Sequence, residues 1–379
     1  MKKILRLLAA VAILALVSCR EDASLEASGR WTAEKANEWY SGIDWPVGCN
    51  YVPAYAGNQL QMWGSATWDP AAIDRELGWA QELGFNSVRI FLHHKLWEDD
   101  RDRFFGRIDE FLSIADSHGI SSLVTLFTNG GSEERYIGED IRPVRGIHNS
   151  IWAQTPGKSI INNPSKWGEI EKYEKDVLKT FGNDRRIITW CLYNEPENVP
   201  DCNTLPLMKK VFEWAREVRP DQPLTATVIT NPFTRKVKYY ERFPIITYAC
   251  ENSDVISYHC YDSTQDHEDF LKMLEPFGRP IFCTEYLART RGCTFQSTLP
   301  LLKEHKVAAY NFGLVNGATQ CHYDWNQVKD GMKIPWQEEP SLWFHDILLP
   351  DGSPWDKKEV KWLKTFLEQS GLQQKTAAQ

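Results

Sequence analysis

Two carboxylates stand where apolar segments of the chain end, and their positions suggest acid–base chemistry. Glu195 follows the apolar run Ile187–Tyr193 and Asn194, and Glu285 follows a second run, Pro280–Thr284. Both runs read as buried strands, so each carboxylate should lie at a strand end, where a (β/α)8 barrel keeps its catalytic groups. Two acids so placed could divide a reaction between a proton donor and a nucleophile, as cleavage of a glycosidic bond with retention requires.

The segments that must position these groups alternate between apolar strands and amphipathic helices along the whole chain. Runs such as Leu123–Phe127 are continuously apolar, as parallel strands covered on both faces should be. The pattern predicts an α/β fold with a single (β/α)8 TIM barrel. A doubly wound open sheet is the alternative, but no Gly-x-Gly-x-x-Gly follows the first strand. We expect strands at Val47–Val52, Ser87–Leu92, Ser121–Phe127, Ile187–Tyr193, Leu224–Ile229, Val255–Cys260, Pro280–Thr284 and Ala308–Val315.

Helices are expected between these strands, several of them with recognisable ends. Asp69-Pro70 supplies an N-cap and a first-turn proline, and Gly84 and Gly119 suit the left-handed position after a helix. Residues 129–166 and 316–356 form long connections after the third and eighth strands, and in a barrel such loops wall the catalytic face. The expected helices are Asp69–Leu83, Arg101–His118, Trp167–Phe181, Leu205–Val218, a weaker one at Arg235–Arg242, His267–Phe277, Ser297–His305 and Lys357–Gln369.

The composition of the 379 residues is that of a globular protein without an electrostatic surface for nucleic acid. The net charge is −8, and the sequence has neither a basic stretch nor an acidic tail, so no nucleic-acid partner is expected. Aromatic residues make up 12% of the chain. This surplus slightly favours stacking on sugar rings, although a large packed barrel could absorb it.

The N-terminus has the features of a bacterial lipoprotein signal. Basic residues precede an apolar stretch, Leu7–Val17, that is too short to span a bilayer, and Leu16–Cys19 resembles a lipobox. We therefore expect a signal peptide at 1–18, lipidation of Cys19, a tether at 19–28 and one catalytic domain at 29–379. The mature protein should be a membrane-anchored lipoprotein of a Gram-negative bacterium, periplasmic or on the cell surface, with the lipid as its only membrane contact. Simple secretion with an incidental cysteine is the alternative.

The other eight cysteines suggest packing rather than metal binding. Four of them, Cys49, Cys191, Cys260 and Cys283, fall inside expected strands, and no Cys-x-x-Cys or His-x3-His pair indicates zinc. No metal or other cofactor is expected. The sequence leaves open a disulfide among Cys202, Cys250, Cys293 and Cys321.

In combination, three motifs resemble the clan A glycoside hydrolases, most closely family 5 and related cellulase-like enzymes. These motifs are Asn194-Glu195-Pro196, Glu285 and Tyr258-His259-Cys260-Tyr261, each at an expected strand end. The resemblance covers nearly all of the folded chain and implies that Glu195 is the acid/base and Glu285 the nucleophile. It also implies that Asn194 contacts the sugar 2-hydroxyl and that His259 and Tyr261 face the site.

Further candidates for substrate binding come from strand two and the loops. Arg89 is a charge inside an apolar strand, which is costly unless paired, and the resemblance assigns it to hold Glu285 ionised with a lowered pKa. His93 is an even number of residues after Arg89, so it should point to the same side of an extended strand. His148 lies in a polar and aromatic part of the loop after the third strand. Family 5 enzymes commonly carry a Trp at the end of strand eight, where this chain has Tyr310–Gly313. Trp325, or alternatively Trp63, is therefore expected to be the sugar platform.

Together these features predict a retaining β-glycoside hydrolase acting on an oligo- or polysaccharide such as glucan, mannan, xylan or galactan. Two alternatives remain open. A transglycosylase would use the same residues with another acceptor, and a lipid-anchored glycan-binding protein would keep the barrel without catalysis.

Overall fold

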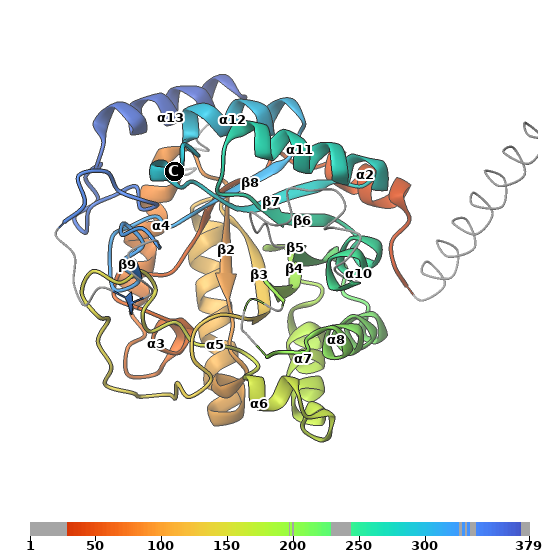
Figure 1. Ribbon diagram of the computed structural model, residues 1–379. Helices are drawn as coiled ribbons and strands as arrows, with labels where there is room; N and C mark the ends of the chain where they lie inside the picture. Colours follow the sequence, from red (N-terminus) through yellow and green to blue (C-terminus); the bar gives the residue numbers. More distant parts are fainter. Residues whose placement is uncertain are drawn as a thin grey trace, which may run out of the picture.

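The computed structural model describes residues 29–196, 198, 201–228, 244–325, 328–329, 332–333 and 339–372, and they form a closed barrel of eight parallel strands. Each strand pairs with the next in sequence, and the eighth pairs with the first, which confirms the predicted (β/α)8 fold (Figure 1). The strands are β1 (Val47–Asn50), β2 (Ser87–Phe91), β3 (Ser121–Thr128), β4 (Ile187–Asn194), β5 (Leu224–Val228), β6 (Ile256–His259), β7 (Ile281–Tyr286) and β8 (Ala308–Phe312).

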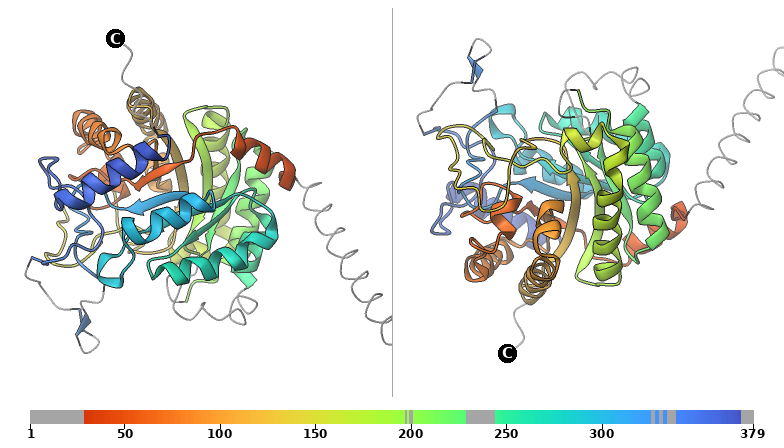
Figure 2. Two further views of the ribbon diagram at one scale, coloured as in Figure 1. Left: turned by 90° about the horizontal axis from the view of Figure 1, so that it is seen from above. Right: turned by 90° about the horizontal axis from the view of Figure 1, so that it is seen from below.

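Helices surround the barrel, as the two turned views show (Figure 2). The expected helix at Arg235–Arg242 lies outside the described residues, and an unpredicted helix, Pro244–Asn252, directly precedes β6. The helix after β2 begins at His94, not Arg101, and continues across a non-helical residue at Asp100. The helices are α2 (Ala33–Ser41), α3 (Gln59–Trp63), α4 (Pro70–Leu83), α5 (His94–Ser117), α6 (Lys158–Ile161), α7 (Trp167–Phe181), α8 (Leu205–Val218), α10 (Pro244–Asn252), α11 (Thr264–Leu274), α12 (Phe295–Glu304) and α13 (Lys357–Gln369).

Local signals explain where some of these helices begin and end. The Asp69 side chain accepts a hydrogen bond from the backbone N–H of Ala72, and Pro70 occupies the first turn of α4, as predicted. Gly84 ends the same helix in the left-handed conformation, with φ of 94°. These two caps fix the length of α4 and thereby the point at which the chain enters β2.

The interior of the barrel changes from apolar to polar along its axis. A small apolar cluster that includes Leu123, Phe282 and Tyr310 fills one layer. Trp39 and Tyr40 of α2 pack on Phe282 of this cluster, with ring centroids 6.4 and 5.6 Å away. Helix α2, which packs on this layer, was not predicted, although Thr32 caps it by accepting from the backbone N–H of Lys35. The polar layer lies toward the carboxyl ends of the strands, where catalytic groups of this fold are found.

Within the described residues, none of the helices has the length and apolarity needed to cross a bilayer. The signal peptide and the tether with Cys19, expected together at 1–28, lie outside the described residues. The expectation of lipidation therefore stays a prediction.

Candidate active site

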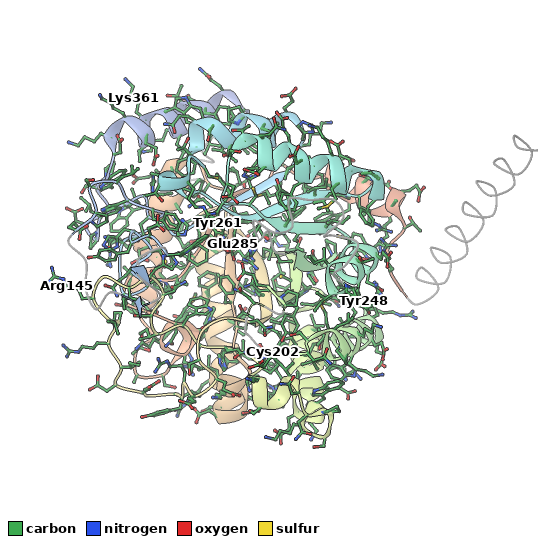
Figure 3. The ribbon with its side chains drawn as sticks, viewed as in Figure 1. Arg145, Cys202, Tyr248, Tyr261, Glu285 and Lys361 are labelled. Atoms are coloured by element: carbon green, nitrogen blue, oxygen red, sulfur yellow. The ribbon has the colours of Figure 1, made fainter. Side chains whose placement is uncertain are left out.

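The two predicted catalytic carboxylates meet at the carboxyl ends of β4 and β7. Glu195 directly follows β4, whereas Glu285 lies inside β7, which runs two residues further than the sequence suggested. One oxygen of each carboxylate and one ring nitrogen of His259 all lie within 4.8 Å of one another. Figure 3 shows Glu285 and Tyr261 together in the interior of the barrel.

The backbone is irregular where these side chains are aimed. Glu195 has a positive φ of 47°, an uncommon conformation for a residue other than glycine. His259 and Glu285 are register partners across β6 and β7, and the register shifts between Tyr258 and His259. Such irregularities re-aim side chains near active sites. They bring His259 beside both carboxylates.

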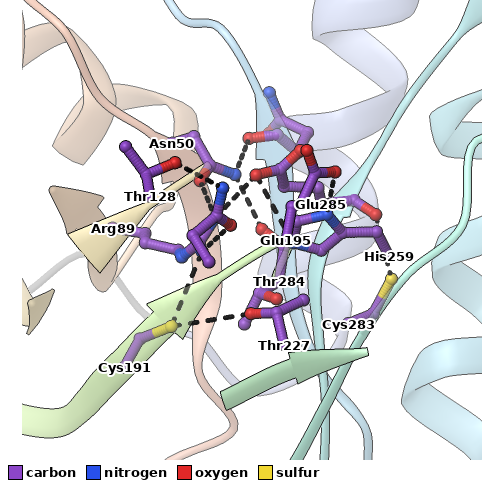
Figure 4. A network of polar contacts seen from close by, with 12 residues as sticks. Asn50, Arg89, Thr128, Cys191, Glu195, Thr227, His259, Cys283, Thr284 and Glu285 are labelled. Carbon is purple, nitrogen blue, oxygen red and sulfur yellow. Dashed lines mark hydrogen bonds and ion pairs between the residues drawn. The ribbon is translucent and has the colours of Figure 1, made fainter. Parts of the chain in front are cut away.

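Arg89 is the buried cation that organises this end of the barrel (Figure 4). Its Nη1 donates to Oε1 of Glu285 at 2.7 Å and to Oδ1 of Asn50 at 2.8 Å. Its Nη2 donates to Oδ1 of Asn194, whose own amide nitrogen donates to the Thr128 hydroxyl at 2.9 Å. A buried charge is tolerable when paired and hydrogen-bonded in this way. Arg89 therefore fixes the orientation of both Glu285 and Asn194.

Tyr261 and His259 supply the other contacts of the carboxylates. The Tyr261 hydroxyl donates to Oε2 of Glu285 at 2.5 Å. His259 places Nδ1 2.8 Å from Oε1 of Glu195 and Nε2 3.4 Å from Oε1 of Glu285. Asn198 donates to the second oxygen of Glu195 at 2.6 Å. All four carboxylate oxygens thus have a polar partner.

Burial dominates the titration of this group. It raises the pKa of Glu195 to about 7, against the lowering effects of Arg89 and Asn198. It also raises the pKa of Glu285, with Glu195 adding to the rise while His259, Arg89 and Tyr261 oppose it. Arg89 lowers the pKa of Glu285, as predicted, but desolvation of the buried carboxylate outweighs this pairing, so the net pKa is raised.

The proton of the pair is best placed on Glu195. Arg89 bonds Glu285 directly, so the negative charge is more stable there. Burial lowers the pKa of His259 to about 3, so its ring is neutral near pH 7 and carries one N–H. The anionic Glu285 favours that N–H on Nε2, which leaves Nδ1 as an acceptor for a proton on Glu195. This assignment gives the site one acid and one charged carboxylate.

Glu195, His259 and Glu285 are also the kind of donor set that can hold a metal ion. A cation there would have to displace the partners that the oxygens already have, and the Arg89 guanidinium lies 2.7 Å from Glu285. The arrangement fits an acid and nucleophile pair better than a metal centre.

The carboxylates open into a cleft of about 460 Å³, a size typical of small-ligand sites. His148 and Trp325 line it as expected, and the Trp325 side chain is 37% exposed. Sequence reasoning missed several residues, although polar side chains at strand ends could have indicated some of them. The missed residues at or beside the cleft are Asn50, Phe91, Thr128, Asn129, Asn198, Asp262, Arg291 and Phe312.

Two predicted substrate contacts are wrong. Trp63 is completely buried, stacks on Trp68 and donates its indole N–H to the carbonyl of Phe91 at 2.8 Å, so it packs behind the barrel. His93 is 1% exposed and caps α5 by accepting from the backbone N–H of Lys95. Strand β2 ends at Phe91, so the alternation used to place His93 does not extend to it.

The eight cysteines of the described residues are all buried and form no disulfide, which answers the open question about Cys202, Cys250, Cys293 and Cys321. Cys49, Cys191 and Cys283 lie within strands, as predicted, whereas Cys260 directly follows β6, which ends at His259. Cys191 also accepts a long contact from Arg89 at 3.7 Å. The cysteines therefore act here as small packing groups.

Solved structures that are similar to this barrel include several glycoside hydrolases. The exo-β-1,4-mannosidase Op5Man5 of Opitutaceae bacterium strain TAV5 aligns with a TM-score of 0.57 and 17% identity over 86% of this chain and 59% of that one. A GH5_18 protein of Streptomyces cattleya, solved with Manβ1-4GlcNAc, gives 0.59 and 13% over 86% and 81%. The endo-1,4-β-mannanase of Rhizomucor miehei gives 0.56 and 16% over 84% and 95%.

Because the sequence identities are low, these similarities establish the barrel fold and nothing more. No family model matches the chain. No curated protein matches it either. The chain spans 59% of the length of the Opitutaceae mannosidase. What the protein does must therefore be argued from its own site.

Proposed function

We propose that the protein is a retaining β-glycoside hydrolase. The observation that carries the proposal is the pair Glu195 and Glu285, whose nearest oxygens lie within 4.8 Å, with Arg89 on one and neutral His259 between them. Retaining enzymes separate their two carboxyl groups by about 5–5.5 Å, and inverting enzymes by about 6.5–9.5 Å. The short separation leaves no room for a water between nucleophile and sugar, and so favours direct attack.

In the proposed reaction, an oxygen of Glu285 forms a bond to the anomeric carbon while the bond from that carbon to the departing oxygen breaks. Glu195 gives its proton to that oxygen. In the second step, a water molecule gives a proton to Glu195, and the water oxygen attacks the anomeric carbon. The bond between that carbon and Glu285 breaks, which releases the carboxylate. One amide N–H of Asn194 is not used by Thr128 and can reach toward the sugar 2-hydroxyl.

The test is turnover of 4-nitrophenyl β-D-mannopyranoside, glucopyranoside, xylopyranoside and galactopyranoside. β-Mannosides come first because the Opitutaceae and Rhizomucor neighbours are named for acting on them. Proton NMR within the first turnovers should show the β-anomer. Glu285→Ala should abolish turnover, and azide or formate should partly restore it by filling the vacated space. The exposed Glu275→Ala is the matched control and should behave as wild type.

Each contrary result would exclude a different part of the proposal. The inverted anomer would exclude the double displacement, and wild-type turnover by Glu285→Ala would remove that residue from the mechanism. Saturable sugar binding without turnover would instead favour a glycan-binding protein. Transfer of the glycosyl group to added sugar acceptors in preference to water would identify a transglycosylase.

A further inference from the structure

Within the described residues, the loops after β3 and β8 meet to form a wall on one side of the cleft. The backbone N–H of Asn149 in the β3 loop donates to the carbonyl of Thr319 in the β8 loop at 2.9 Å. The side-chain amide of Gln320 binds the β3 loop: its oxygen accepts from Gly146 N–H at 3.0 Å, and its nitrogen donates to the carbonyl of Val144 at 2.7 Å. We call these two hydrogen bonds the clasp. Figure 1 shows these loops on the same side of the barrel.

The wall reaches the cleft through aromatic side chains. His148, from the β3 loop, places Nδ1 3.0 Å from the carbonyl of Tyr323, and Trp325 donates to its Nε2 at 3.3 Å. Both side chains line the cleft. On the inner side Trp152 packs edge-on against Phe91, with ring centroids 5.3 Å apart.

A third loop braces the wall from behind. After β1, the carbonyl of Ala54 accepts from the backbone N–H of Ala318 at 2.8 Å. The Asn58 amide donates to the carbonyl of Ile151 at 2.9 Å. A Cβ at Gly317 would lie 2.2 Å from the Ala54 carbonyl oxygen, so the chains touch closely there. The wall thus rests on the β8, β1 and β3 sector and is held by backbone contacts that a substrate cannot easily displace.

This wall stands on the nucleophile's side of the cleft. Trp325 packs edge-on on Tyr261 with centroids 4.7 Å apart, and the Tyr261 hydroxyl donates to Glu285. Phe91 lies under the guanidinium of Arg89, which also binds Glu285. The sugar that becomes bonded to Glu285 must therefore lie against the wall.

We propose that the wall ends the cleft beyond that sugar, so that the protein removes single residues from the non-reducing ends of β-linked chains. This inference rests on the proposed hydrolase function. A sugar attached to the nucleophile through its anomeric carbon carries any further chain toward the non-reducing end. With no space beyond it, only a terminal residue can occupy the position, whatever the length of the chain on the leaving side.

The test uses the purified full-length chain with mannohexaose, cellohexaose and xylohexaose, each labelled at the reducing end with 2-aminobenzamide. The expected first labelled product is the pentaose alone, followed in order by the tetraose and triose, with free monosaccharide released at every step. Labelled di- or trisaccharides among the first products would overturn the inference while leaving the hydrolase function intact. No turnover of any hexaose or aryl glycoside would instead refute the proposed function on which it rests.

Variants of the clasp give an independent measurement. Gln320→Ala removes the bonds to Gly146 and Val144, and it should release labelled tetraose directly and raise KM for the aryl glycoside at least about tenfold. Trp325→Ala opens the inner face without touching the clasp and should also release tetraose. Tyr136, in the β3 loop, has a side chain that is 60% exposed. Tyr136→Ala is therefore the control and should keep the wild-type products. Unchanged products in both wall variants would contradict the assignment.

Discussion

The pH profile of the hydrolytic reaction should have its basic limb near pH 7, set by Glu195. Burial raises the pKa of this group from 4.5 to about 7. At pH 6 an acid of pKa about 7 is about 90% protonated, whereas one of pKa 4.5 would be about 3% protonated. The fold therefore supplies about 30-fold more of the proton donor at this pH. Since the acid form is required, kcat/KM should fall about tenfold for each pH unit above the pKa.

The measurement is kcat/KM between pH 4 and pH 9 for an alkyl glycoside, whose leaving group needs a proton, and for a 2,4-dinitrophenyl glycoside, whose leaving group does not. Glu195→Gln should slow the first substrate by about 10²–10⁴-fold and the second far less. It should also abolish the basic limb. The apparent pKa values belong to the coupled carboxylate pair, and the variant identifies the member that carries the proton. A basic limb that survives unchanged in Glu195→Gln, or equal losses on both substrates, would refute the assignment.

Three further predictions test the surroundings of the pair and the chain's location. Arg89→Met should lower kcat and move the acidic limb of the pH profile upward, because Glu285 loses its cation, and it should cost about 3–5 kcal/mol of unfolding free energy by chemical denaturation. Trp63→Ala should cost about 3–5 kcal/mol but leave substrate preference unchanged, because Trp63 is a core residue; a changed preference would restore it as a platform. If Cys19 is lipidated, the native host should hold the protein in its membrane fraction, and Cys19→Ala should leave an uncleaved or mislocalised precursor; unchanged processing to a soluble product would show that the cysteine is incidental.

The barrel could be predicted because its signals are local and repeated. Apolar strand runs, helix periodicity and caps such as Asp69 recur along the chain, and each can be read without knowledge of its neighbours. The errors lie where tertiary contacts decide. Helix α2 is short, and what places it is the packing of Trp39 on Phe282, far along the sequence. The two residues added to β7 are likewise held by pairing with neighbouring strands, Glu285 with His259 of β6 and Tyr286 with Asn311 of β8.

The site was predictable to the extent that single residues were chemically anomalous. Arg89 in an apolar strand demanded a buried partner, and the structure places Glu285 at 2.7 Å. Trp63 misled because an aromatic residue in a loop has the same appearance whether it faces a ligand or the core. The effect of Arg89 on the pKa of Glu285 could be predicted because the charge of a partner can be read from the sequence, whereas the net shift could not, because the extent of desolvation depends on every atom packed around the carboxylate.

The length of substrate that the cleft accepts should depend on the loops, whereas the chemistry should depend on residues at the ends of the strands. Glu195, Glu285 and Arg89 lie on or directly after strands, and every barrel of this type can present such groups at the same end. The neighbours of this chain include one named an exo-mannosidase and one named an endo-mannanase, with nearly equal similarity to it. Similarity of the barrel therefore carries no information about action at chain ends. In this protein we expect that property to depend on loop contacts such as those of the Gln320 side chain with the backbone of residues 144–147, which have no periodicity and leave no motif in the sequence. Selection could change the mode of attack by altering the clasp while leaving the catalytic pair untouched.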